Sequence, residues 1–332
     1  MKGYKAKLGE AEKVKKKLIG EGLIDFGYKP LKTEEHIIFP LARSAEMKNT
    51  VDVEFEKQKE KIKDLREALK GVLSREELEA LKTSYDTIGS IAILEIDDEL
   101  RHKEKLIAEK LLEVNNSLLT VLRKDDKHKG PFRNQKYKYL AGEKTTVSVH
   151  KENGCLIKLD VSLMYYSPRL GNDRIRIAEN VKKGERILVI GCGCGPYPIV
   201  ISKHSHAESV VGVDINKEAI AYAEINKKLN KLRNVLFYVE DGSKFLKKSD
   251  GFDRIVLATP ENSDEFIELA FEKVIKGHIH YNFFSKLKDV GETQAKLESI
   301  ADSKGKKISI KFVRNGHHAP YIYRMSADIK VL

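Results

Sequence analysis

Hydrophobic positions change their spacing several times along this chain. Between Leu8 and Ile19, apolar residues recur at the intervals that place them on one face of a helix. Residues 36–40 are mostly apolar and end in a proline, a pattern typical of a short strand. Together these segments predict a small α/β module over residues 1–50.

A charged stretch separates this module from the next one. Residues 51–79 hold few apolar positions, and residues 54–70 suit a helix without an apolar stripe, which favours a solvated helical linker. Beyond the linker, residues 90–96 form a mostly apolar run that predicts a buried strand, and residues 97–113 have the pattern of an amphipathic helix. We therefore predict a second, α+β module over residues 80–150.

A hairpin signal lies where this second module ends. Residues 145–150 and 155–161 alternate polar and apolar positions around Asn153 and Gly154. An Asn-Gly pair between two alternating segments favours a hairpin, because both residues tolerate the positive φ of a two-residue turn. This hairpin is expected to connect the second module with the last domain.

From Gly184 onward the chain alternates strands and helices. The continuous apolar run at 186–190 is typical of a strand buried on both faces, and it enters a glycine-rich loop. The alternation continues through strands at 209–214, 235–239 and 254–257 and helices at 217–229 and 263–275. We therefore predict an α/β protein whose C-terminal domain, residues 151–332, is doubly wound and Rossmann-like, with two smaller N-terminal α+β modules.

The glycine-rich loop and the end of the next strand indicate a cofactor that contains a nucleoside. Gly191, Gly193 and Gly195 allow positive φ and let the backbone approach a ligand closely. Asp214, at the end of the second strand, can accept hydrogen bonds from both hydroxyls of a ribose. Pro196 begins the helix where a dinucleotide-binding fold would need another glycine, so the loop resembles that of class I methyltransferases, which use S-adenosylmethionine.

Charge and composition narrow the choice of partners. Lysine and arginine number 61 against 50 aspartate and glutamate, which leaves a formal net charge of +11. Basic residues interleaved with aromatic ones over residues 132–139 suit RNA, although a solvated basic loop has the same composition. The sequence contains neither an apolar run long enough to cross a membrane nor a secretory leader. We expect a soluble, cytoplasmic protein.

The cysteines indicate neither a disulfide framework nor a metal site. The chain has 3 cysteines, and two of them, Cys192 and Cys194, flank Gly193. Neither has a further cysteine or a His–Cys pair at the spacing that would complete a zinc site. We interpret both as small residues that fill the loop, and we expect no metal.

Several motifs together resemble one known family. They are Phe132-Arg133, residues 139–143, residues 150–154, residues 166–174, residues 214–216, residues 228–232, His280-Tyr281 and Ala319-Pro320. Through them the chain is similar to the archaeal tRNA (guanine-37 N1)-methyltransferases, and Ser167 to Gly171 is the most specific segment. The resemblance implies a three-module enzyme whose first module contacts the outer corner of tRNA. The other two would enclose the anticodon branch and extrude guanosine 37. A monomer is expected, because no heptad seam is present.

The resemblance also implies roles for single residues. Arg133 is expected to contact guanine O6 and Asp173 to accept the N1 proton, while Arg169 and Pro260 bind the substrate. These roles suit the chemistry, because removal of the N1 proton frees a lone pair for attack and places negative charge on O6, where a guanidinium stabilises it. The residues expected to bind the cofactor are Arg174, Gly191, Gly193, Gly195, Pro196, Asp214, Ile215, Asp241 and Gly242.

Three positions depart from the family's pattern. Asp173 stands where the family usually has glutamate, so its carboxyl group is one methylene closer to the backbone. Val189 replaces an acidic residue on the first strand, which leaves Asp160 as a substitute partner for the methionine ammonium. Ala258 replaces the asparagine of an Asn-x-Pro segment that would line the pocket near the target base.

Simpler roles compete with these assignments. Arg169 and Arg174 could pair with carboxylates, and Arg133 could hold a phosphate. Asp173 could cap a helix. Two other functions compete with N1 methylation: transfer of an aminocarboxypropyl group to a modified tRNA guanosine, and tRNA binding by a protein whose cofactor site has decayed.

Overall fold

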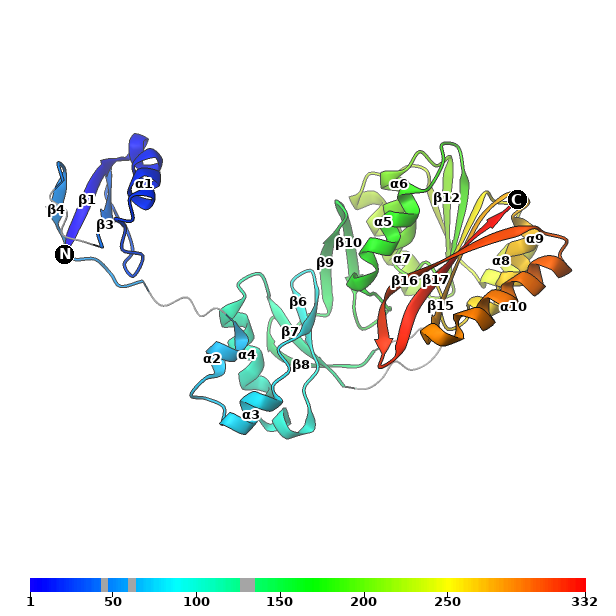
Figure 1. Cartoon of the computed structure of the whole chain (residues 1–332), viewed down its shortest axis with the longest axis horizontal. Helices are drawn as coiled ribbons and strands as arrows, with labels where there is room; N and C mark the ends of the chain where they lie inside the picture. The colour runs from blue at the N-terminus through cyan, green and yellow to red at the C-terminus, as the bar shows by residue number, and fades with distance from the viewer. Residues whose placement is uncertain (43–46, 59–63, 126–134) are drawn as a thin grey trace. The chain divides into compact units, whose positions relative to one another are not determined.

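The computed structural model describes residues 1–42, 47–58, 64–125 and 135–332 of the chain (Figure 1). The residues divide into two compact units, Met1–Glu67 and Ala68–Leu332. The division falls inside the stretch that the charge pattern predicts as a linker, residues 51–79.

The first unit is built on an antiparallel sheet, against which one helix packs. The strand order is β2 (Leu31–Lys32), β3 (His36–Pro40), β1 (Lys2–Lys7) and β4 (Thr50–Asp52). A 3-10 turn, Leu8–Glu10, leads into α1 (Ala11–Gly20). Leu18 of α1 and Phe39 of β3 are buried in one apolar cluster, which joins the helix to the sheet. Both the helix and the strand that the sequence predicts for this module are present.

Phe55 extends the first unit beyond residue 50. It is buried, and a Cβ placed on Gly3 would lie 2.4 Å from its Cζ atom, so the ring fills the space that this glycine leaves open. Residues 53–58 are not helical, which differs from the helix predicted over 54–70, and α2 is confined to Leu65–Leu69. Phe55 is therefore a buried residue of the first unit, although its charged neighbours led the sequence analysis to assign it to a linker.

The N-terminal part of the second unit contains a mixed sheet. Its strand order is β5 (Tyr85–Ile88), β6 (Ile91–Leu94), β7 (Thr120–Lys124) and β8 (Tyr137–Gly142). Strands β6 and β7 are parallel, and a 3-10 segment, Asp98–Lys103, and α4 (Glu104–Val114) form the crossover between them. Before the sheet, α3 (Arg75–Ala80) begins at a capping box made by Ser74 and Glu77. This is the α+β arrangement that the pattern predicts for the region.

The predicted hairpin is present as β9 (Val147–Glu152) and β10 (Cys155–Asp160). Asn153 and Gly154 form its turn, and both have positive φ, as a two-residue hairpin turn requires. The boundary predicted between residues 150 and 151 falls inside β9, so it would divide a single hairpin.

Two asparagines hydrogen-bond the backbone groups at the free edge of β10. One lies in α7 (Lys217–Leu229) and the other follows its last residue. Asn226 accepts a hydrogen bond from the Lys158 amide at 2.7 Å and donates one to the Lys158 carbonyl at 2.9 Å. Asn230, just after the helix, pairs in the same way with both backbone groups of Leu156. The two amide side chains replace a neighbouring strand, which attaches the hairpin to the C-terminal domain.

Replacing Asn226 by alanine should destabilise the second unit strongly. The side chain is fully buried and makes a third hydrogen bond, to the Cys194 carbonyl at 2.9 Å. Its loss leaves the backbone groups of Lys158 unpaired, and we expect the free energy of unfolding to fall by about 2–4 kcal/mol. Urea unfolding measures this, with exposed Gln294→Ala in α10 as the matched control. An equal, small loss in both variants would contradict the edge-pairing role.

The C-terminal domain is built on a seven-stranded sheet in the order β13-β12-β11-β14-β15-β17-β16. Strands β11 to β15 are parallel, and β17 joins β15 and β16 in antiparallel pairing. The strands are β11 (Arg186–Ile190), β12 (Ser209–Asp214), β13 (Val235–Val239), β14 (Arg254–Leu257), β15 (Gly277–Ser285), β16 (Ile308–Ala319) and β17 (Ile322–Val331). The predicted doubly wound domain is therefore confirmed.

Helices cover both faces of this sheet (Figure 1). One face packs against α5 (Gly171–Glu179), α6 (Pro196–His204) and α7, and the other against α8 (Gly242–Lys248), α9 (Ile267–Lys273) and α10 (Val290–Ser303). Ile187 and Val189 of β11 enter the first core, while Leu188 and Ile190 enter the second. The run is apolar throughout because successive side chains point to opposite, equally buried faces.

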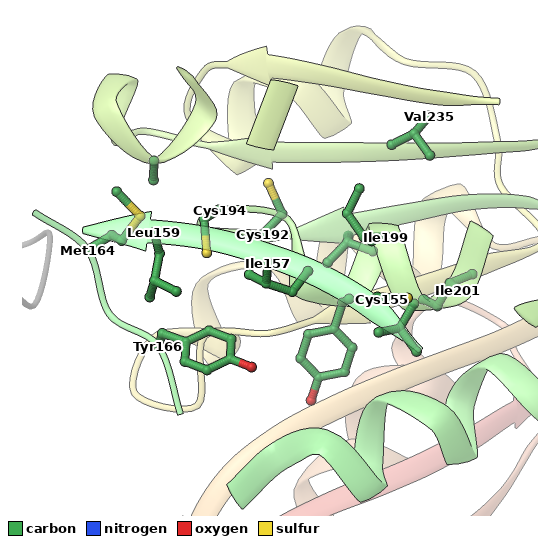
Figure 2. Packing of buried hydrophobic residues seen from close by; sticks show 14 of the residues in the cluster. Cys155, Ile157, Leu159, Met164, Tyr166, Cys192, Cys194, Ile199, Ile201 and Val235 are labelled. Carbon is green, nitrogen blue, oxygen red and sulfur yellow. The ribbon is translucent and has the colours of Figure 1, made fainter. Parts of the chain in front are cut away.

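Figure 2 shows Cys192 and Cys194 inside the first of these cores, beside Ile157 and Ile199. Both cysteines are buried, and burial raises the pKa of the Cys194 thiol to about 12. In the described parts of the chain, no group of three or more His, Cys, Asp or Glu side chains could hold a metal ion. Nor do those parts include a helix with the length and apolar character needed to cross a membrane.

Candidate active site

A cavity of about 250 Å³ lies at the carboxyl ends of β11, β12, β13 and β14. This is the edge of a doubly wound sheet where the strand order reverses and helices leave in opposite directions, so loops diverge and leave room for a ligand. Its lining includes Ile190, Gly191, Gly193, Val213, Asp214, Ile215, Glu240, Asp241, Gly242, Ala258, Thr259, Glu261 and Phe266. We call it the donor cavity.

The glycine-rich loop forms one wall of the donor cavity. Gly191 has φ of +71°, and a Cβ at this position would lie 2.1 Å from Cγ2 of Thr259, so no larger residue fits. The Gly193 amide donates to Oδ2 of Asp214 at 2.8 Å, and the Asn216 amide donates to Oδ1 at 2.9 Å. The carboxylate thus holds the loop in place while it faces the cavity, and burial raises the pKa of Asp214.

The opposite wall comes from the ends of β13 and β14. Asp241 is the N-cap of α8 and accepts a hydrogen bond from the Lys244 amide at 2.9 Å. Thr259 follows β14, and its Oγ1 atom is buried without a hydrogen-bond partner among the described residues. A buried hydroxyl left unpaired at a cavity wall is available to a bound ligand.

The donor cavity includes six residues that the sequence analysis assigned to the cofactor: Gly191, Gly193, Asp214, Ile215, Asp241 and Gly242. Gly195 and Pro196 are buried at the start of α6, where they shape the loop from behind. Arg174 is buried elsewhere, in an ion pair with Glu152 of β9 and a 3.0 Å hydrogen bond to the Ser167 carbonyl. The simpler role considered for Arg174, pairing with a carboxylate, is the one observed.

The departure at Val189 lies outside the cavity. Val189 is fully buried in the apolar core beneath the loop, so the first strand presents no acid to a ligand here. Asp160, the substitute considered from the sequence, accepts hydrogen bonds from the Ser162 amide and hydroxyl and does not line the donor cavity. Glu261 and Glu265 are the carboxylates that sequence reasoning missed at this cavity.

A second, larger cavity of about 900 Å³ adjoins the first. We call it the acceptor cavity. Strands β5 to β8, residues 161–169 and the β16–β17 hairpin supply its walls. The two cavities share Met164, Tyr165 and Glu261. A small ligand in the donor cavity and a larger one in the acceptor cavity would therefore meet at these three residues.

Polar and charged side chains line the acceptor cavity. Arg169 pairs with Asp86 of β5, with Nη2 and Oδ1 2.8 Å apart, so the pairing that the sequence left open is observed. Arg324 of β17 donates to the Tyr165 hydroxyl at 3.0 Å and to Ser167 Oγ at 3.3 Å. His317 and His318 complete this corner. Neither histidine was predicted, because the sequence of β16 (Ile308–Ala319) gives no sign that the end of this strand lies at the cavity.

One residue expected near the target base lines neither cavity, and another lies outside the described residues. Pro260 lines neither cavity, although its neighbours Thr259 and Glu261 do. Arg133 lies outside the described residues, so its expected contact with O6 stays a prediction. Gln135, two positions later, lines the acceptor cavity.

Asp173 belongs to the first turn of α5, is buried, and lines neither cavity. Its Oδ1 atom accepts a hydrogen bond from Arg176 at 2.7 Å, and its Oδ2 atom accepts one from the Tyr197 hydroxyl at 2.5 Å. It does not cap the helix either, because Leu170 occupies the N-cap position of α5. In this structure Asp173 ties α5 to α6 and leaves neither oxygen pointing into a cavity.

A buried polar network continues from Asp173 across the sheet. Arg176 pairs with Asp328 of β17, which accepts from Nδ1 of His280 at 2.7 Å. Nε2 of His280 lies 2.7 Å from Nη1 of Arg254, and a guanidinium can only donate, so His280 is neutral with its proton on Nδ1. Burial lowers the pKa of His280, in agreement with the neutral form.

Comparison with known proteins gives three family-model matches. They are the TRM5/TYW2 methyltransferase domain over residues 148–310, the TYW2 N-terminal domain over residues 65–145, and the tRNA methyltransferase 5 N-terminal domain over residues 5–49. Trm5b of Pyrococcus abyssi, a tRNA (guanine(37)-N(1))-methyltransferase, is 33% identical over 98% of both chains.

Solved structures are similar over most of the chain. A complex of aTrm5 with tRNALeu has a TM-score of 0.76 at 26% identity and covers 99% of both chains. Pyrococcus horikoshii TYW2 in complex with MeSAdo has a TM-score of 0.68 at 26% identity, and the match covers 81% of this chain and 98% of that one. The similarity thus extends to a relative with tRNA bound and to one with a nucleoside bound.

Proposed function

This chain belongs to the family of tRNA (guanine-37 N1)-methyltransferases, and we propose that it transfers the methyl group of S-adenosylmethionine to N1 of guanosine 37 in tRNA. The observation that carries the proposal is the meeting of two cavities within one unit of the chain. One is small and built from the glycine-rich loop, and the other is large and polar. Because both are made by a single chain, we propose that a monomer binds one tRNA.

The donor cavity suits S-adenosylmethionine. Asp214 would accept the ribose hydroxyls, and Asp241 would accept from the adenine amino group. The backbone of Gly191 and Gly193 leaves room for the methionine part, and the unpaired Thr259 hydroxyl offers it a hydrogen bond. When bound, the sulfonium supplies a methyl group that a nitrogen lone pair can attack.

The acceptor cavity suits an extruded guanosine. A base leaves its stack only if the protein replaces the lost contacts, and Tyr165 and Tyr166 offer rings while Arg169 and Arg324 offer cations. Arg133 would stabilise the charge on O6, as the resemblance implies. The unit Met1–Glu67 would contact the outer corner of tRNA, and the β5–β8 module the anticodon branch.

The chain's own residues would act by alignment and proton removal. In-line transfer needs N1, the methyl carbon and sulfur on one axis. The residues that line both cavities support placing that axis where the cavities meet. The N1 proton must leave before or during attack, because its bond occupies the electron pair that forms the new bond.

A methyl-transfer assay with nucleoside mass analysis tests the proposal. Purified protein, S-adenosylmethionine and unmodified tRNA should give 1-methylguanosine, and the product should vanish when guanosine 37 is replaced by another nucleotide. A larger adduct on a modified guanosine would instead indicate aminocarboxypropyl transfer. The match of residues 65–145 to the TYW2 N-terminal domain is the reason for testing this alternative. Tight tRNA binding without any product would indicate a decayed site.

A further inference from the structure

Arg324 is the cation of the acceptor cavity whose charge no described carboxylate balances. In the described part of the chain, the lysine and arginine side chains that line this cavity are Lys124, Arg169 and Arg324. Lys124 pairs with Glu95 at 2.6 Å, and Arg169 pairs with Asp86 at 2.8 Å. Arg324 forms no ion pair with a described residue and hydrogen-bonds hydroxyl groups instead. Its positive charge is therefore available to a ligand.

Two neutral hydroxyls hold the Arg324 guanidinium at the cavity wall. Its Nη2 atom donates to the Tyr165 hydroxyl at 3.0 Å, and its Nη1 atom donates to Ser167 Oγ at 3.3 Å. A hydroxyl oxygen orients a guanidinium without neutralising its charge, and each Nη atom carries a second N–H. Because a donor remains on both Nη atoms, the planar guanidinium can bind two oxygens of one oxyanion.

The neighbouring strands fix the direction of this side chain. In the register of the sheet, Arg324 of β17 lies opposite Phe284 of β15 and Gly316 of β16. Side chains that lie directly opposite on neighbouring strands share one face of the sheet. The guanidinium is 5.8 Å from the centre of the Phe284 ring, and the His318 ring stacks on Phe284 with the centroids 3.9 Å apart. The guanidinium is thus supported by an aromatic ring on one side and held by hydroxyls at its tip.

Arg324 lies next to the place where the two cavities meet. Tyr165, which accepts its hydrogen bond, lines both the donor cavity and the acceptor cavity. Arg324 itself lines the acceptor cavity and not the donor cavity. With S-adenosylmethionine in the donor cavity, the guanidinium therefore faces the molecule that receives the methyl group.

A phosphodiester is the part of the tRNA that this cation suits. The ribose and the base carry no formal charge when they enter, whereas each phosphate carries a negative charge shared by two oxygens. A nucleotide is extruded by rotation about its own backbone, so the phosphates on either side of guanosine 37 move with it toward the cavity. Contacts to phosphates hold the strand in register and leave the reading of the base to other residues.

We propose that Arg324 binds one of the two phosphates that flank guanosine 37 and so holds the extruded nucleotide in the acceptor cavity. The inference rests on the proposed function and adds a contact to the substrate backbone. No covalent bond forms or breaks in this contact. The guanidinium donates hydrogen bonds to two phosphate oxygens and balances one negative charge.

Methylphosphonate substitution tests the contact, because it removes the charge of a single phosphate. Each phosphate beside guanosine 37 is replaced in turn, and the Kd for the tRNA is measured with saturating S-adenosylhomocysteine, which has no methyl group to transfer. One of the two substitutions should weaken binding to the wild-type protein by about 10-fold. Arg324→Met should bind unmodified tRNA about 10-fold more weakly, and the same methylphosphonate should then have no further effect. The slope of log Kd against log salt concentration should also decrease by about 0.7–1.

Arg186→Met is the matched control. Arg186 is exposed at the start of β11, the end away from the donor cavity, and its guanidinium is 5.8 Å from the centre of the Phe252 ring. This variant should show the same methylphosphonate effect as the wild-type protein. Arg324→Lys keeps the charge without the planar fork, so it should retain part of the effect.

Three results would overturn the proposal. They are a wild-type Kd that neither methylphosphonate changes, a methylphosphonate effect as large in Arg324→Met as in the wild-type protein, and a loss of affinity in Arg324→Met that follows the base at position 37 instead of the phosphate. The first of these requires no variant to fold. Formation of 1-methylguanosine by the wild-type protein is measured in parallel. Its absence would refute the proposed function, whereas its presence without the phosphate effect would refute only the contact of Arg324.

Discussion

Asp214→Ala is expected to weaken S-adenosylmethionine binding by roughly 100-fold, the largest loss of affinity for any single residue of the donor cavity. A carboxylate that accepts both ribose hydroxyls makes two charge-assisted hydrogen bonds, and alanine makes neither. The substitution also releases the amides of Gly193 and Asn216, which Asp214 holds at 2.8 and 2.9 Å. Isothermal titration calorimetry with S-adenosylmethionine, in the absence of tRNA, measures the effect.

The affinity for S-adenosylmethionine should also depend on pH through the ionisation of Asp214. Burial raises its pKa, so the carboxylate is lost on acidification at a higher pH than for an ordinary aspartate. Affinity should therefore be full above that pKa and fall as the pH decreases through it, and Asp214→Asn should remove the dependence. Unchanged affinity in Asp214→Ala, or an unaltered pH dependence in Asp214→Asn, would mean that the ribose lies elsewhere.

The strands that carry this site can be predicted because each one is marked by a pattern of apolar residues within its own few positions. Residues 187–190 and 210–213 carry no polar side chain on either face, as strands covered by helices on both sides require, and α7 begins and ends at the predicted residues. The glycine spacing then places Gly191 and Asp214 at the same sheet edge. Six of the residues that the sequence predicts to bind a cofactor line the cavity for this reason: they follow strands whose order is fixed by the fold.

The rest of the site depends on contacts between distant segments, which no local pattern encodes. Thr259 and Glu261 reach the cavities because β14 lies next to β11, and His318 because it lies near the end of β16. Asp173 and Arg174 have the sequence of an exposed, charged helix start. Their burial becomes visible only when Tyr197 and Glu152 are placed against them.

Glu152→Ala is expected to cause the largest loss of stability among the substitutions considered, about 3–5 kcal/mol in the free energy of unfolding. Glu152 and Arg174 are both buried and form an ion pair, and Glu152 also accepts from the Tyr166 hydroxyl at 2.8 Å. The Arg174 guanidinium lies 5.0 Å from the centre of the Tyr166 ring. Alanine at position 152 leaves this cation buried without its counter-ion.

A double-mutant cycle shows whether the pair acts as a unit. Urea unfolding of Glu152→Ala, Arg174→Met and the double variant should give a double-variant loss well below the sum of the single losses, because the double variant leaves no unpaired charge. The exposed pair supplies the control: Arg169→Met removes the partner of Asp86 and should cost less than about 1 kcal/mol. Titration of folded Arg174→Met with S-adenosylmethionine decides the residue's role. Wild-type affinity means that Arg174 holds the hairpin to α5, whereas lost affinity at unchanged stability would return it to the cofactor site that the sequence motif implied.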